Sequence, residues 1–210
     1  MSKQLAFYID TSACAKCKAC QIACQDVNNL PAHMRWRRVL PYEGGTWIPH
    51  PNDKNLMQPS GLFSYAVSVS CMHCEDPICV EVCPTGASIK NEDGIVYVDP
   101  DKCIGCRYCE WACPYGARHF DDTTGVMTKC DFCRGLLAQG KNPACVDACV
   151  MRALKFGDLE ELRAQYGDLA AIEPLPAAEL TKPSVVITPH KHAQPSGRGI
   201  GKVNQLPEEV

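Results

Sequence analysis

Cysteine is the residue type through which this chain can do chemistry. The sequence has 210 residues and 16 cysteines, a fraction far above ordinary usage. The cysteines fall into four groups of four, at residues 14–24, 71–83, 103–113 and 130–149. Their spacings are C-x2-C-x2-C-x3-C, C-x2-C-x4-C-x3-C-P, C-x2-C-x2-C-x3-C-P and C-x2-C-x11-C-x3-C. Every group therefore closes with the same x3-C step.

The third group has the cysteine spacing of bacterial ferredoxins that bind [4Fe–4S] clusters, including a proline after Cys113. The second group differs from it only by two additional residues. In such a run three thiolates hold one cluster and the fourth, entering a helix, reaches a neighbouring cluster. Clusters therefore come in pairs that exchange ligands. The short connection between groups two and three predicts that they form one pair, which leaves groups one and four for the other.

Three other uses of many cysteines fit this pattern less well. A disulfide framework is typical of small secreted domains, and cysteines this close in sequence do not pair readily within a group. Structural zinc sites use two C-x2-C pairs and seldom add cysteines at x2 and x3, although a zinc-structured scaffold stays an alternative. A radical-generating cluster requires C-x3-C-x2-C, which the sequence lacks. Four cubes contain sixteen iron atoms, so sixteen thiolates leave no obviously open iron on which a substrate could bind. We therefore expect electron transfer and no catalytic residue.

Positive charges stand in or next to the cysteine groups. They are Lys16, Lys18, Lys102, Arg107, Lys129 and Arg134. Thiolate-bound clusters are anionic, and their potentials respond to nearby charges and hydrogen bonds. These residues are therefore either tuning groups or ordinary solvated loop charges. His73, inside group two, either donates a hydrogen bond to a sulfur or is a plain loop histidine.

Charge and hydropathy exclude two classes of partner contact. The formal net charge of −3 lacks the basic excess that a phosphate backbone requires, so we expect no nucleic acid partner. The longest apolar stretch, residues 62–72, is interrupted by serines, so we expect no direct membrane span. The N-terminus has neither a long apolar segment nor a twin-arginine pair, and export would rely on a partner.

Short strands and helices are expected between the cysteine groups. Residues 87–90 with 95–98, and 117–120 with 126–128, read as two hairpins. Residues 6–9 and 153–156 are expected to be the outer strands of a second unit. Asp158 to Gly167 carries a helix with a capping-box pattern and a glycine stop.

These elements predict an α+β fold class with duplicated two-[4Fe–4S] ferredoxin-like units. We expect residues 1–171 to form the four-cluster domain, with residues 25–70 as a loop-rich insertion because prolines and glycines recur there. Residues 172–210 are proline-rich and are expected to be an extended C-terminal arm, either loose or docked on a partner.

Longer motifs accompany the cysteines. They are Phe7-Tyr-Ile-Asp10, Cys71-Met-His-Cys74-Glu-Asp-Pro77, Cys103-Ile-Gly-Cys-Arg-Tyr-Cys109, Ala112-Cys-Pro-Tyr-Gly-Ala117, Met127-Thr-Lys-Cys130-Asp131 and Gly167-Asp-Leu-Ala-Ala171. On these motifs the chain resembles, over nearly its whole length, the iron–sulfur electron-transfer subunits of the anaerobic dimethyl sulfoxide reductase family, within the molybdopterin oxidoreductases. Gln25 and Val150 depart from the pattern, because each follows a closing cysteine where proline is expected.

The resemblance implies four [4Fe–4S] clusters and their ligand sets. The sets are Cys14, Cys17, Cys20 and Cys149; Cys130, Cys133, Cys145 and Cys24; Cys71, Cys74, Cys79 and Cys113; and Cys103, Cys106, Cys109 and Cys83. The same resemblance places the first cluster nearest molybdenum and the last nearest the quinol site. Related nitrate reductase subunits have a tryptophan at the position of Cys109 and a three-iron cluster there, so a cysteine implies four complete cubes.

The resemblance also implies a role in anaerobic respiration. The chain would be a non-catalytic electron-transfer subunit that relays electrons from a membrane anchor subunit, which oxidises menaquinol, to a molybdopterin catalytic subunit. That subunit would reduce dimethyl sulfoxide or a related S- or N-oxide. Partners for tetrathionate, polysulfide or selenate, and a free-standing polyferredoxin, stay alternatives. The expected location is the membrane periphery, preferably on the periplasmic face after export with a signal-bearing partner, with the cytoplasmic face still open.

Overall fold

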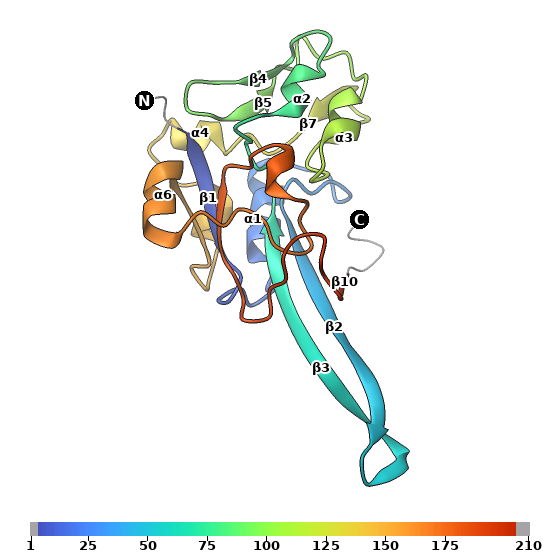
Figure 1. Ribbon diagram of the computed structural model, residues 1–210. Coiled ribbons are helices and arrows are strands. Elements are labelled where there is room, and N and C mark those ends of the chain that lie inside the picture. The colour runs from blue at the N-terminus through green and yellow to red at the C-terminus, as the bar shows by residue number, and fades with distance from the viewer. Residues whose placement is uncertain (1–3, 205–210) are drawn as a thin grey trace.

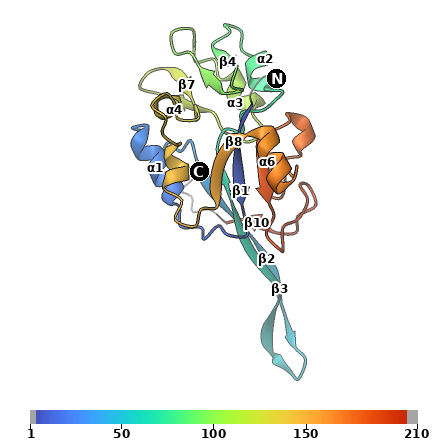
Figure 2. The same cartoon turned by 90° about the vertical axis from the view of Figure 1, so that its left-hand side faces the viewer.

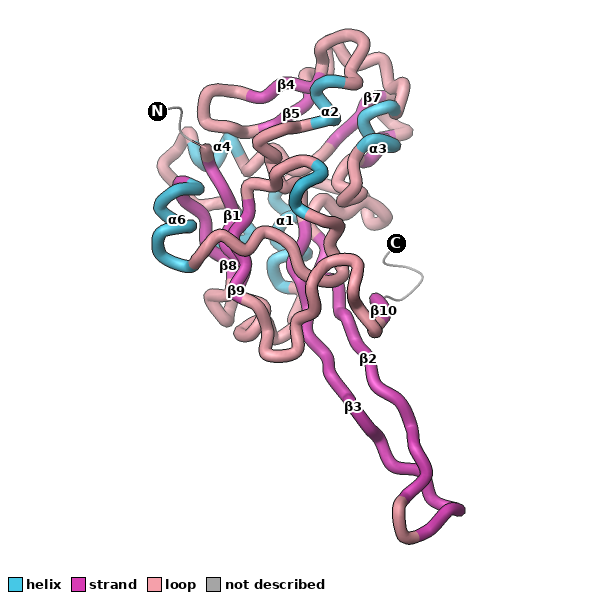
Figure 3. Tube along the Cα trace, in the orientation of Figure 1, coloured by secondary structure: helices cyan, strands magenta, loops and turns pink. Residues whose placement is uncertain are grey.

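The computed structural model describes residues 4–204, which form a body of short elements and one long projecting hairpin (Figure 1). Loops make up much of the body, as Figure 3 shows. The helices are α1 (Ala19–Val27), α2 (Ile78–Glu81), α3 (Tyr108–Ala112), α4 (Arg134–Leu137), α5 (Ala144–Asp147) and α6 (Leu159–Tyr166). The strands are β1 (Leu5–Asp10), β2 (Arg38–His50), β3 (Asp53–Val69), β4 (Ser88–Lys90), β5 (Val96–Val98), β6 (His119–Asp121), β7 (Val126–Thr128), β8 (Leu154–Asp158), β9 (Val185–Thr188) and β10 (Lys202–Val203).

A three-stranded sheet in the order β8–β1–β9 supports the lower part of the body. β1 pairs antiparallel with β8 and parallel with β9. Because successive side chains of a strand point to opposite faces, Ala6 and Tyr8 pack in the small core that α6 covers, whereas Phe7 and Ile9 belong to the main core with several cysteines. Residues 6–9 and 154–156 are strands as expected, and they pair with each other, but β1 is the central strand of the sheet and not an outer one.

Helix α6 begins and ends as its sequence predicts. The Asp158 carboxylate accepts hydrogen bonds from the backbone N–H groups of Glu160 and Glu161, which have no partner inside the helix. Gly167 follows the last turn with φ of 90°. The helix therefore covers the outer face of the sheet with fixed ends.

Two small hairpins lie at the other end of the body, beside α2 and α3 (Figure 1). β4 pairs antiparallel with β5, and β6 pairs antiparallel with β7, close to the predicted positions. Helix α2 contacts α3, and α1 contacts α5, so each end of the body has one helix pair that carries cysteines. The duplication of the two ends stays a prediction.

The prediction of a loop-rich insertion was wrong for residues 38–69. These residues form β2 and β3, a long antiparallel hairpin that projects from the body in both views (Figures 1 and 2). Pro41, Pro49 and Pro59 stand inside the strands. Proline is tolerated here because, along most of its length, the hairpin is a ribbon of two edge strands, whose outward positions need no N–H donor.

The segment after residue 172 is extended for much of its length and lies against the body. Its strand β9 joins the sheet through β1, and Val185, Val186 and Ile187 are buried there. β10 pairs with β2 near the base of the hairpin. The sequence expectation named a loose or partner-docked arm, whereas this part of the segment is a strand of the chain's own fold.

Candidate functional site

The four cysteine groups share one local backbone feature. In each, the residue immediately before the second cysteine has positive φ: Lys16 at 59°, His73 at 44°, Gly105 at 65° and Phe132 at 65°. Only one of the four is glycine, so at the other three positions the backbone adopts a left-handed conformation that non-glycine residues rarely occupy. Turns with a left-handed residue form concave backbone N–H arrangements that favour anions, including iron–sulfur sites. The loops are therefore shaped alike for one kind of anionic group.

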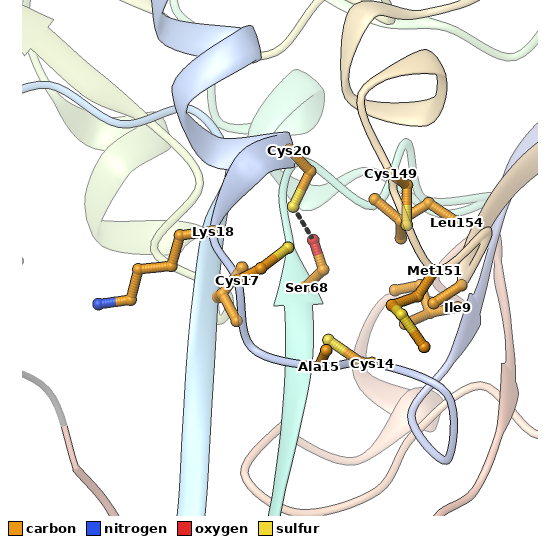
Figure 4. Close-up of a pocket in the computed structure, with 12 residues that line it drawn as sticks. Ile9, Cys14, Ala15, Cys17, Lys18, Cys20, Ser68, Cys149, Met151 and Leu154 are labelled. Carbon is orange, nitrogen blue, oxygen red and sulfur yellow. Dashed lines mark hydrogen bonds between the residues drawn. The ribbon is translucent and has the colours of Figure 1, made fainter.

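The first set of thiols lines a small pocket, together with Ile9 of β1 and Leu154 of β8. Figure 4 shows the sulfur atoms of this set around it, on Cys14, Cys17, Cys20 and Cys149. The Ser68 hydroxyl lies 3.4 Å from the Cys20 Sγ. Burial raises the pKa of the Cys14 thiol, and the other three thiols of this set add to that rise. The structure thus brings Cys149 of the fourth group to the first.

The second set joins Cys24 of the first group to the fourth group. Burial raises the pKa of Cys24 to about 12, and nearby Cys145 and Cys133 contribute to that rise. Cys130 is fully enclosed, and burial together with Cys24 raises its pKa well above the ordinary value. Cys24, which closes group one, therefore lies close to Cys133 and Cys145 of group four.

A cysteine of group three lies beside the thiols of group two in a similar way. Burial raises the pKa of Cys74 to about 12, and further contributions come from Cys71, Cys79 and Cys113. Cys113, which closes group three, thus lies with the thiols of group two.

The fourth set is assembled at the α2–α3 end of the body. Burial raises the pKa of Cys109, and Cys103 of its own group and Cys83 of group two add to that rise. Cys106, half-buried, lies between Cys103 and Cys109 in the same loop. This set therefore mirrors the third, because it receives the closing cysteine of the other group.

The four sets adjoin one another in a series. Cys145 of the second set is close enough to contribute to the raised pKa of Cys20 in the first. Cys130 of the second set is coupled in the same way to Cys71 of the third. Cys109 of the fourth set is coupled to Cys79 of the third. The sets therefore follow the order first, second, third, fourth through the body.

Most of the basic residues that the sequence placed near the cysteines contact carboxylates or an aromatic ring instead of thiols. Lys16 contacts Glu43, Lys102 contacts Asp99, Arg107 contacts Glu110, and Arg134 lies over the Tyr97 ring. Lys129 differs, because it is buried and its ammonium donates to the carbonyl oxygens of Val96 and Cys130. Of these side chains, Lys129 is the one whose burial beside the thiols supports the tuning interpretation.

His73 is fully buried between the second and third sets. Its Nδ1 accepts a hydrogen bond from the Val96 backbone N–H at 3.0 Å, so the neutral ring carries its proton on Nε2. That nitrogen lies 3.8 Å from the Cys130 Sγ. Burial and the surrounding cations hold the pKa of His73 well below its usual range. The arrangement supports the sulfur-donor interpretation of this histidine.

Sequence reasoning missed two buried arginines, Arg37 and Arg118. Burial alone would lower the pKa of Arg37, but thiolates of the first two sets outweigh burial and raise it. The Arg118 guanidinium donates a hydrogen bond to the Cys79 Sγ at 2.9 Å. Neither residue belongs to a cysteine motif, and Arg37 stands between Arg35 and Arg38 in a basic run, so no signal in the sequence singles it out.

The donor sets fit iron–sulfur clusters. Thiolates are the ligands such clusters take, and buried thiols with raised pKa values stay ionised only where bound iron supplies positive charge. Backbone hydrogen bonds, such as the one from Lys16 to Cys14, add the N–H donors that sulfur sites use. Within residues 4–204, no group of three or more Cys, His, Asp or Glu side chains converges on a single metal ion.

Comparison with known proteins gives the same family throughout. A family model described as a 4Fe-4S dicluster domain matches residues 62–159. The chain is 49% identical over 210 residues to a chain of the anaerobic dimethyl sulfoxide reductase of Escherichia coli K12, with all of both chains covered. It is 40% identical to a chain of the polysulfide reductase of Wolinella succinogenes, covering 91% of this chain and 97% of that one.

A third relative has its role in its name. The chain is 41% identical to the thiosulfate reductase electron transfer subunit of Salmonella typhi, covering 79% of this chain and 81% of that one. Full-length identity near one half, together with the matched 4Fe-4S domain, is sufficient to assign a family. The chain therefore belongs to the family of iron–sulfur electron-transfer subunits that includes its full-length relatives from anaerobic dimethyl sulfoxide reductases.

Proposed function

We propose that the chain relays electrons through four [4Fe–4S] clusters in series. The proposed ligand sets are Cys14, Cys17, Cys20 and Cys149; Cys24, Cys130, Cys133 and Cys145; Cys71, Cys74, Cys79 and Cys113; and Cys83, Cys103, Cys106 and Cys109. When bound, the clusters supply one-electron redox chemistry. The chain supplies the thiolates, the loop backbone and the exclusion of water.

The observation that carries this proposal is the exchange of closing cysteines. Cys149 lies with the first group and Cys24 with the fourth. Cys113 lies with the second group and Cys83 with the third. Two reciprocal exchanges, one between Cys149 and Cys24 and one between Cys113 and Cys83, are what paired ferredoxin clusters require. The same exchanges bring neighbouring sets together, which a relay of electrons needs.

Each end of the series meets solvent beside exposed apolar side chains. Val150, with 68% of its surface exposed, directly follows Cys149 of the first set, and exposed Ile22 lies on α1. At the other end, Trp111 is 74% exposed and Tyr108 is 52% exposed, both on α3. Apolar surface of this kind marks protein contacts. We place the two electron-exchange partners at these two ends.

The proposed partners follow from the family. A molybdopterin catalytic subunit would lie at the first-set end, and a membrane anchor oxidising menaquinol would lie at the fourth-set end. The terminal acceptor would be dimethyl sulfoxide or a related S- or N-oxide. In residues 4–204 there is no helix long and apolar enough to cross a bilayer. By its likeness to chains of these reductases, the chain would be a peripheral subunit of a membrane-bound complex, with the periplasmic face as the preferred side.

The proposal is tested by metal content and by one ligand substitution. Anaerobically isolated protein should contain iron and sulfide for four cubes, and zinc without sulfide would contradict the whole assignment. Cys109→Ser should convert the fourth cluster to a three-iron form with a raised potential and slow quinol oxidation, because one iron loses its ligand. Paramagnetic resonance of the assembled complex measures this conversion.

A matched variant locates the effect of Cys109→Ser. Cys71→Ser removes a thiol of the third set, which adjoins the fourth set through Cys79 and Cys109. It should alter a different paramagnetic signal and leave the fourth cluster intact. Identical spectra for the two variants, or an unchanged spectrum for Cys109→Ser, would contradict the ligand sets.

A further inference from the structure

Two guanidinium groups are buried among the thiols without a carboxylate partner. Arg37 is 1% exposed and Arg118 is 2% exposed. Neither forms an ion pair with a carboxylate within residues 4–204. Burying an unpaired cation is costly, so the fold must provide another negative partner for each.

Arg118 lies between the third and fourth thiol sets. One terminal nitrogen donates to the Cys79 Sγ at 2.9 Å and to the Ser88 hydroxyl. On the other side, Cys109 of the fourth set is close enough for the Arg118 charge to lower the pKa of its thiol. The Nε and Nη1 atoms of Arg118 are buried, and across the described residues they have no hydrogen-bond partner. Two nitrogen atoms, with three N–H donors between them, therefore lie beside the thiols without a partner among the described residues.

Arg37 occupies the corresponding place between the first and second sets. It donates to the Ser68 carbonyl oxygen at 3.0 Å, to the Ser68 hydroxyl at 3.1 Å and to the Ser70 hydroxyl at 2.9 Å. The Ser68 hydroxyl is in turn 3.4 Å from the Cys20 Sγ of the first set. Thiolates of the second set, Cys145 among them, act on the same guanidinium. In the described part of the chain its Nε is buried and unpartnered as well.

We propose that Arg37 and Arg118 are positioning residues for electron transfer, each giving one cluster pair a shared, fixed positive charge that raises the reduction potentials of both members. This inference rests on the proposed function. A cation beside a cluster stabilises the added electron, and hydrogen bonds to its sulfur atoms act in the same direction. Because both guanidinium groups are buried, their charge acts with little screening by solvent. It also reduces the repulsion between two anionic clusters that stand side by side.

The experiment compares charge-removing and charge-keeping variants in the assembled complex. Redox titration followed by paramagnetic resonance gives the potential of each cluster in Arg118→Gln, Arg118→Lys, Arg37→Gln and Arg37→Lys. Arg118→Gln should lower the potentials of the third and fourth clusters and leave the first and second unchanged. Arg37→Gln should do the reverse. Each lysine variant should recover most of the shift, because the charge is restored.

Arg107→Gln serves as the control. Arg107 stands between two cysteines of the fourth set, but its guanidinium is half-exposed and paired with Glu110 at 2.6 Å. Solvent screens such a charge, so this variant should leave all four potentials unchanged. Equal shifts in Arg107→Gln and Arg118→Gln would overturn the proposal.

Cluster loss and an incorrect inference give different results. Iron and sulfide analysis accompanies each titration. If the glutamine variant loses clusters while the lysine variant keeps them, the requirement for charge is supported. If both lose clusters equally, or if fully loaded glutamine variants keep wild-type potentials, the arginines have a structural role only and the inference fails. Neither result would affect the proposed function, which is tested separately by the iron and sulfide content of the wild-type protein and by the spectra of Cys109→Ser and Cys71→Ser.

Discussion

At the scale of single residues, the thiols and one buried cation, Lys129, could be predicted from sequence, whereas the two buried arginines could not. Spacing alone identifies sixteen ligand candidates, because sulfur chemistry needs cysteines at fixed intervals. Arg37 and Arg118 have no motif, and they reach the thiols only through the fold. Three of the expected cations, Lys16, Lys102 and Arg107, are paired with carboxylates instead. Charge near a motif in sequence is therefore a weak guide to charge near a cluster in space.

The raised thiol pKa values predict how the cluster-free chain responds to alkali. Burial raises the pKa of Cys24 and Cys74 from 9.0 to about 12. A raised folded-state pKa stabilises the fold below pH 9, and this stabilisation is lost as the pH rises toward 12. The urea midpoint of cluster-free protein should therefore fall between pH 9 and pH 12.

Loaded protein is the control for this alkaline response. Its thiolates are already deprotonated by iron, so they do not titrate in that range. Buried tyrosines such as Tyr65, with a pKa raised to about 12, titrate in both forms. The cluster-free protein should therefore lose stability more steeply. Parallel curves for the two forms would show that the thiols are not buried as the structure has them.

At the scale of elements, sequence patterns predicted structure where a few residues define the element. They failed where the same residues occur in both loops and strands. The Asp158 cap and the two small hairpins could be predicted, because capping and turn chemistry lie within a few residues. The long hairpin could not, because Pro41, Pro49 and Pro59 are also typical of loops. That segment forms strands because β2 and β3 pair along their length, from Arg38 with Val69 at the base of the hairpin. A pattern of a few neighbouring residues does not reveal such pairing.

At Gly105, adding a single methyl group should disturb the whole loop that carries Cys103 and Cys106. It has φ of 65°, and an added Cβ would lie 2.3 Å from the Gly125 carbonyl oxygen, where the β6–β7 turn closes. Gly105→Ala should push the fourth-set loop away from that hairpin and destabilise the protein by about 1–3 kcal/mol. Denaturant unfolding and the fourth-cluster signal measure the two effects.

Gly61→Ala separates backbone strain from collision. Gly61 has φ of 62°, but an added Cβ meets nothing within 4 Å, and the residue lies in the hairpin away from the thiols. It should cost only the left-handed strain, about 1 kcal/mol, and leave every cluster signal intact. If Gly105→Ala behaved the same way, close packing between the loop and the β6–β7 turn would not matter.

At the scale of the whole molecule, the segment after residue 172 packs against the part of the fold that carries the four cysteine sets. β9 completes the sheet through β1, and buried Val185 to Ile187 close the core beside it. Upstream of β9, the Thr181 hydroxyl contacts the Tyr115 hydroxyl at 3.1 Å, and Ser184 donates to the His73 carbonyl at 2.8 Å. The division at residue 171 stays a prediction, since cluster loops and late segment support each other.

Ending the chain after Ile172 should therefore damage the clusters as well as assembly. The truncation removes β9, whose buried valines and isoleucine are each worth about 1.5–3 kcal/mol, against a total stability of about 5–15 kcal/mol. It also removes the Lys182 carbonyl oxygen that accepts from the Glu75 backbone N–H at 2.7 Å, next to Cys74. The third-cluster signal should be lost and soluble yield should fall, whereas a chain ending at Asn204 should retain all four signals. Four normal clusters in the shorter chain would mean that residues after 172 serve only contacts with partners.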